Sequence, residues 1–205
     1  IFVGNDWTST GTFTEGSSTV EFDETGNAIV GSEQFNKVVI NKTDSSNTVS
    51  MKGGMTTVLD LRITSGILDT DSGGDNSIDT GTDIRLDASG QLVANGSTIN
   101  CGGDWINTPG YGNGLTPGTS TIIMDEGGNN SVGPTIFYNF QINKDLAGEK
   151  ISLTGKIKTN NNLTVTNGNL DTTTSNYSIE TDKDFSIGAT GTVTANDSNF
   201  NVGQS

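Results

Sequence analysis

The chain has 205 residues, of which 30% are hydrophobic and 17% are charged, and its formal net charge is −14 at pH 7. This acidic balance argues against a nucleic-acid partner, which needs a basic surface. No apolar run reaches about 18 residues, so we expect no direct membrane insertion of this segment. Apolar residues fall in short alternating clusters such as 20–22 and 61–63, which is typical of strands with one buried face. The predicted fold class is all-β.

A tandem repeat organises the chain from its N-terminus onward. Residues 16–70 match residues 118–172 at a spacing of 102, and Trp7 is matched by Trp105. A short insertion near 109–115 shifts the spacing between these two matches. We therefore predict two units within one continuous rod, the first of residues 1–102 and the second of residues 103–205.

Alternate apolar positions are kept between the two units, whereas the residues between them vary freely. Inward side chains are restrained by packing and outward ones are not, so the kept positions identify the core. The predicted core stack consists of Val20, Phe22, Val38, Ile40, Leu61, Ile63, Ile122, Phe140, Ile142, Leu163 and Val165. By the same pattern, four residues near the C-terminus should also face inward: Phe185, Ile187, Val193 and Ala195.

Glycines recur between the strands of both units. Glycine adopts positive φ at the least cost, so we expect these positions to form corners with positive φ. The pairs are Gly26 and Gly128, Gly53 and Gly155, Gly66 and Gly168, and Gly90 and Gly191.

The predicted strand segments, called phrases below, are short and closely spaced. Three phrases per turn give coils of about 22–25 residues, and hence about eight or nine coils in all. This rhythm predicts a right-handed parallel β-helix, a β-solenoid, whose coils have either two or three sides. The alternative is two stacked β-sandwich domains of about 100 residues each.

Several stretches of sequence resemble the tandem repeats of large prokaryotic surface proteins. They include GDWINTPGYGNGLTPGTSTIIMDEGG, FYNFQINK and NNLTVTNGNLDT, and the likeness covers nearly the whole chain. Such proteins are similar to filamentous-haemagglutinin-like and pectin-lyase-like β-helices. The resemblance implies an adhesin, stalk or filament subunit outside the cell, and it points to no particular ligand.

The first and the last residues of the chain occupy equivalent positions of the repeat. Solenoid ends expose unpaired strand edges unless a cap covers them. We therefore expect end-to-end contacts with identical subunits or with further repeats of the same chain, through Ile1, Phe2, Val3, Phe200 and Val202.

The expected function is that of a structural segment in an extracellular fibre, or in a cell-surface filament or stalk. The alternative is an adhesin module that binds a glycan or a protein partner on a host or neighbouring cell surface. In that case the corner loops 107–117 and 69–76 would carry the binding.

No enzymatic activity is expected. The chain has no histidine and only two arginines, Arg62 and Arg85, which are replaced by Thr164 and Ser186 in the second unit. Lyases and hydrolases of comparable folds need basic residues or clustered carboxylates. The one cofactor considered is Ca²⁺, because oxygen ligands alternate around glycines in one loop. The alternative interpretation of this loop is a solvated acidic corner without a metal ion. The candidate Ca²⁺ ligands are Asp69, Asp71 and Asp75.

Other polar and aromatic positions carry weaker expectations. Cys101 occupies a core slot of the repeat and should be buried, and both tryptophans should pack rather than bind sugars. Lys42 and Lys144 are equivalent and should be solvated strand ends. Six Asn-x-Ser/Thr sequons are glycosylation candidates, at Asn41, Asn95, Asn129, Asn162, Asn176 and Asn196.

Overall fold

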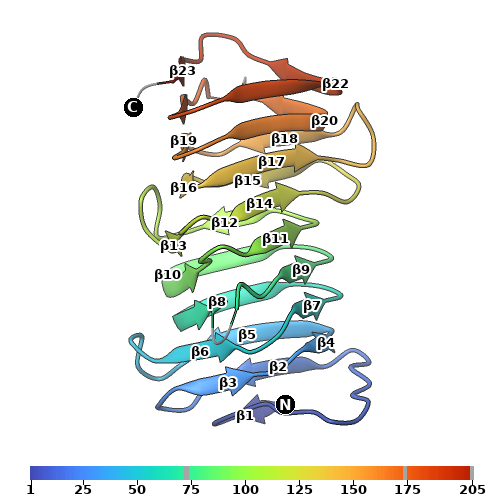
Figure 1. Ribbon diagram of the computed structural model, residues 1–205, viewed down its shortest axis with the longest axis vertical. Coiled ribbons are helices and arrows are strands. Elements are labelled where there is room, and N and C mark those ends of the chain that lie inside the picture. Colours follow the sequence, from blue (N-terminus) through green and yellow to red (C-terminus); the bar gives the residue numbers. More distant parts are fainter. Residues whose placement is uncertain (72–73, 173–174, 204–205) are drawn as a thin grey trace.

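The computed structural model describes residues 1–71, 74–172 and 175–203. It is an all-β parallel β-solenoid of about 9 turns, with the N-terminus at one end of the stack and the C-terminus at the other (Figure 1). Every strand pairing within the described residues is parallel. The predicted solenoid is thus confirmed and the sandwich alternative is wrong, while the right-handed sense stays a prediction.

Each coil passes through three faces, and strands of successive coils pair within a face. Face 1 contains β1 (Phe2–Val3), β2 (Thr19–Phe22), β5 (Lys37–Asn41), the first parts of β8 (Leu61–Asp69) and β10 (Ile84–Val93), β12 (Trp105–Asn107), β15 (Asn130–Val132), β18 (Lys150–Leu153), and the last parts of β20 (Leu163–Asp171) and β22 (Phe185–Thr194).

Face 2 contains β3 (Ala28–Val30), β6 (Thr48–Met51), the last parts of β8 and β10, β13 (Leu115–Thr116), β16 (Thr135–Phe137), β19 (Ile157–Thr159), β21 (Ile179–Thr181) and β23 (Phe200–Val202). Face 3 contains β4 (Glu33–Phe35), β7 (Met55–Thr57), β9 (Ile78–Thr80), β11 (Thr98–Cys101), β14 (Thr121–Met124), β17 (Asn139–Asn143), and the first parts of β20 and β22.

Equivalent strands of the two predicted units lie on different faces. Strand β2 lies on face 1, whereas its sequence equivalent β14 lies on face 3. The long strands β8 and β10 turn the corner between faces 1 and 2, whereas β20 and β22 turn the corner between faces 3 and 1. The sequence repeat is therefore rotated by one face about the axis of the solenoid.

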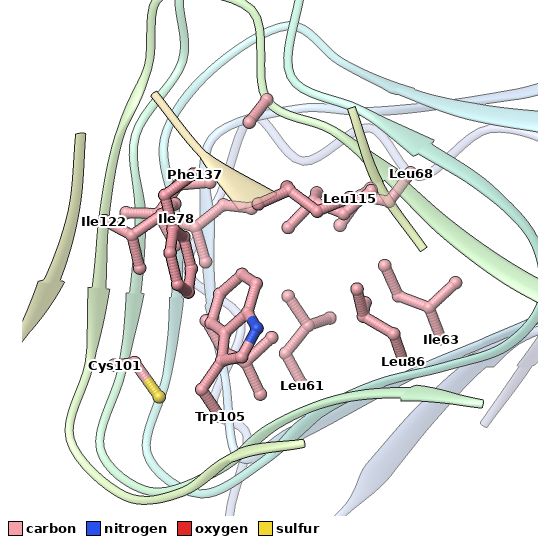
Figure 2. Packing of buried hydrophobic residues seen from close by; sticks show 14 of the residues in the cluster. Leu61, Ile63, Leu68, Ile78, Leu86, Cys101, Trp105, Leu115, Ile122 and Phe137 are labelled. Atoms are coloured by element: carbon pink, nitrogen blue, oxygen red, sulfur yellow. The ribbon is translucent and has the colours of Figure 1, made fainter. Parts of the chain in front are cut away.

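The core is a column in which side chains from all three faces meet, as Figure 2 shows for Leu61 on face 1, Leu115 on face 2 and Ile122 on face 3. All eleven residues of the predicted core stack are buried. Alternation explains this result, since every second side chain of a strand points to the same side. Burial repeats from coil to coil because each strand lies in register with the next.

The predicted corner glycines divide into two groups. Gly26, Gly66 and their equivalents Gly128 and Gly168 have φ between 89° and 97°, as expected. The other four have no positive φ, so that part of the prediction is wrong. At Gly90 the reason for glycine is steric, because a Cβ would lie 2.0 Å from the carbonyl oxygen of the preceding coil.

The last coil differs from the prediction that its apolar residues are buried. Ile187 is 52% exposed, and Ala195 is also exposed. Phe185 and Val193 are only partly buried. These side chains belong to the pattern of the core, but within the described residues no further coil covers them.

Candidate functional site

The predicted calcium ligands accept hydrogen bonds from their own corner and from the corner of the next coil. Asp69 Oδ1 accepts hydrogen bonds from the amide of Asp71 at 3.0 Å and from Asn95 Nδ2 at 2.7 Å. Asp75 Oδ1 accepts from the amide of Gly96 at 2.8 Å. Across residues 1–71, 74–172 and 175–203, no group of three or more His, Cys, Asp or Glu side chains could hold a metal ion. Calcium binding stays a prediction to which the geometry adds no support.

The sequon asparagines differ in how free their side chains are. Asn41 Nδ2 donates to Glu21 Oε1 at 2.8 Å, and Asn95 Nδ2 is engaged as described above, so a glycan on either would break a bond. Asn129 and Asn162 accept backbone amides through Oδ1. Asn176 and Asn196 are exposed. Asn129 is exposed as well, so glycosylation stays a prediction for which Asn176 and Asn196 are the exposed positions without a side-chain bond described above.

The predicted end-to-end residues lie at the two open ends of the stack. Ile1 and Phe2 are exposed at one end, where Phe2 reaches 75%, and Val3 is half-buried. At the other end Val202 is exposed and Phe200 is half-buried, stacked on Phe185 with 5.8 Å between ring centroids. Exposed Ile187 joins this second surface, although its sequence pattern assigned it to the core.

Cys101 and both tryptophans have structural roles. Cys101 is fully buried, and burial raises the pKa of its thiol to about 12, so it is unreactive. Trp105 is buried, and its Nε1 donates to Thr135 Oγ1 at 3.0 Å. Trp7 packs edge-on against Phe35 with 5.3 Å between ring centroids. The packing predicted for these three residues is confirmed.

The two equivalent lysines are buried, so the prediction of solvated strand ends is wrong. Lys42 is 1% exposed and Lys144 is 2% exposed. Each follows a strand, at the start of a loop that bulges from the coil, and its stem lies over Gly66 or Gly168 of the next coil. A glycine 24 residues after the lysine in both units was the available signal, since only glycine leaves room for that stem.

The surroundings of the two ammonium groups differ. Lys144 Nζ donates to Asn130 Oδ1 at 2.7 Å and to the main-chain oxygen of Asp125. Lys42 Nζ is buried and has no hydrogen-bond acceptor among the described residues. Burial lowers the pKa of both lysines.

A groove lies on the side of the rod, over the corner where β8 and β10 turn between faces 1 and 2. It has a volume of about 610 Å³, and the loop at 45–46 and the inserted segment at 109–114 both line it. Asn107 holds the inserted segment in place, because its buried Nδ2 donates to the carbonyl oxygens of Gly110, Asn113 and Pro134. The lining is mostly polar, with Gln91 and Asn113 among its side chains.

No protein-family model, curated protein or solved structure matches the chain. In the part of the chain that the structure describes, no helix is long and apolar enough to cross a membrane.

Proposed function

We propose that this chain is a structural segment of an extracellular fibre or of a cell-surface filament or stalk, in which blocks stack end to end through their terminal strands. The neighbouring block is an identical subunit or a further repeat of the same chain. The single observation that carries the proposal is the difference between Leu86, which is 0% exposed, and its repeat equivalent Ile187, which is 52% exposed.

The difference arises because another coil covers one strand and not the other. Strand β12 pairs with β10 above Leu86, whereas β22 pairs only with the preceding β20 among the described residues. Burying one isoleucine or phenylalanine side chain contributes about 1.5–3 kcal/mol. A block seated on β22 would therefore gain from Ile187 at one end and from Ile1 and Phe2 at the other.

Backbone and charge support the same direction of association. The open edges of β1, β22 and β23 leave main-chain N–H and C=O groups that another strand can pair with. The net charge of −14 opposes side-by-side contact between rods. Stacking along the axis is the contact that the surface favours.

Electron microscopy and sedimentation of the purified protein test the proposal. We expect long uniform fibres, and we expect the double variant Ile187→Lys and Val202→Lys to abolish them, because two ammonium groups would be buried at the junction. Thr98→Lys is the matched control, since Thr98 is exposed on the side of the rod and should leave the fibres unchanged.

Where the neighbour is a further repeat, isolated chains stay single. Appending another copy of residues 103–205 after residue 205 then slows amide hydrogen exchange in β22. A protein that forms no fibres, and whose β22 gains no protection from the appended copy, contradicts both forms of the proposal.

The lateral groove favours a second candidate, an adhesin module that binds a glycan. Polar side chains such as Gln91 and Asn113 are the kind that hydrogen-bond sugar hydroxyls. Binding of discrete monomers to a glycan array, lost in Gln91→Ala, would favour this candidate. An array without any signal would count against it.

A further inference from the structure

The corner that contains Lys144 brings three reactive groups together. Lys144 follows β17, while Asp125 and Asn130 bracket the loop between β14 and β15 of the preceding coil. Lys144 Nζ lies 2.7 Å from Asn130 Oδ1, and the bond lengths of an amide then place Nζ within about 4 Å of Asn130 Cγ. An amine and a carboxamide carbon are thus already near attack distance.

Burial adjusts the acid and the amine in opposite directions. The pKa of the Asp125 carboxyl rises to about 6, first because of burial and then because of the charges of Asp79 and Glu126. Burial also lowers the pKa of Lys144. Asp125 Oδ1 is inaccessible to solvent and has no hydrogen-bond partner in the described part of the chain. Lys144 Nζ contacts the main-chain oxygen of Asp125 rather than its carboxylate, so the carboxylate has to turn toward the amine before it can take a proton. Burial then makes that transfer less costly than it would be in water.

We propose that Lys144 and Asn130 join covalently, through an amide bond between Lys144 Nζ and Asn130 Cγ. The neutral amine attacks Cγ, the Nζ–Cγ bond forms, and the bond between Cγ and Nδ2 breaks. Two hydrogens leave the ammonium of Lys144 and convert the departing amide nitrogen into ammonium. Asp125 relays these protons and ends unchanged, so the step needs no oxidant and no cofactor.

The first unit provides the matched comparison. Lys42 corresponds to Lys144 and Asp23 to Asp125, but Ala28 stands where the second unit has Asn130. Lys42 Nζ and Asp23 Oδ1 are both buried and without hydrogen-bond partners among the described residues. The amine and the acid are present there, and only the carboxamide is missing.

The bond would fasten two neighbouring coils at the corner between faces 3 and 1. A rod pulled along its axis separates coil from coil, and a covalent tie there resists the separation more than ladder hydrogen bonds do. The inference rests on the geometry of the corner and does not require that the chain forms fibres.

Intact-mass spectrometry of the denatured recombinant chain tests the proposal. We expect the mass to be lower than the sequence mass by one ammonia, and Asn130→Ala to restore the full mass. That variant should fold, because the first unit carries alanine at the same place. Residues 86–143 contain no lysine or arginine, so tryptic mapping should give one peptide of residues 86–150, lighter by one ammonia, closed into a loop by the new bond and uncleaved after Lys144.

Ala28→Asn in the first unit should produce a second ammonia loss, through Lys42. Asp125→Asn should slow the reaction in the second unit, which would appear as a mixture of full and reduced masses. A wild-type chain at its full mass overturns the proposal. So does an ammonia loss in a chain that trypsin still cleaves after Lys144, because a cyclic imide at Asn130 gives the same mass change without using Lys144.

Discussion

Strands β10 and β22 have equivalent sequences but unequal surroundings. In β10 the inward residues Leu86 and Leu92 are fully buried between β8 and the strands of the next coil. In β22 the equivalent Ile187 is half exposed, and Val193 is only partly buried. The contrast shows that a coil of this solenoid does not bury its own apolar side chains, because its neighbours on both sides complete the burial. Stability is then a sum over junctions between coils.

The largest predicted effect on the free energy of unfolding comes from removing a side chain of the covered coil, which leaves a cavity. Leu86→Ala should lower the free energy of unfolding by about 2–5 kcal/mol, because the covered coil cannot collapse into the gap. Ile187→Ala should cost less than about 1 kcal/mol in the single rod, since half of that side chain already meets water. Urea unfolding of the two variants measures the difference. Equal losses would mean that β22 is covered in solution.

The next effect concerns glycines that touch the preceding coil. A Cβ on Gly90 would lie 2.0 Å from the oxygen of Ile63, and one on Gly191 would lie 2.1 Å from that of Val165. Gly90→Ala should cost about 1–3 kcal/mol through overpacking, because coils on both sides fix its strand. Gly191→Ala should cost less, since the open end can shift outward. Thermal unfolding of both variants checks this order, and a larger loss for Gly191→Ala would contradict it.

The fold could be predicted from the sequence because its determinants are local and repeated. The pairs Val20 with Phe22 and Val38 with Ile40 show the period of two, and their return in the second unit gives the inward side directly. The three-faced cross-section and the rotation of the repeat by one face could not be read in the same way. They depend on how many corners each coil turns, and β8 turns one without any break in its strand.

The candidate sites were harder to predict, because they depend on which residues meet across coils. The sequence shows Lys144 after a strand, where a lysine usually meets water, and it shows Asn130 as part of an acidic, Asn-rich loop. Only the stacking of one coil on the next brings Nζ to the carboxamide. The sequence predicts only part of the end surface. It places Val202 there, but it places Ile187 in the core, because burial of Ile187 depends on another coil covering it.

The dependence of stability on pH provides a further test in the second unit. The folded pKa of Asp125 is about 6 against an ordinary 3.8, so the folded state binds its proton more tightly than the unfolded chain does. Its contribution to stability is therefore largest below pH 3.8 and is lost as the pH rises through about 6. Asp125→Asn should remove this part of the pH dependence, as measured by unfolding at a series of pH values. Asp23→Asn is the matched variant of the first unit, and an unchanged profile in Asp125→Asn would contradict the assignment.

The smallest effect concerns the side of the rod, where two arginines of the first unit share one aspartate. Asp87 accepts from Arg62 and from Arg85 at 2.7 Å each, and the two arginine side chains are 45% and 44% exposed. Arg85→Ser, which installs the residue found at the equivalent Ser186, should cost about 0.2–1 kcal/mol. Salt screens exposed charges, so the loss should shrink in concentrated salt. Urea unfolding at low and high salt measures it, and a loss as large as that of Leu86→Ala would mean that the side face, rather than the column of buried side chains, holds the coils together.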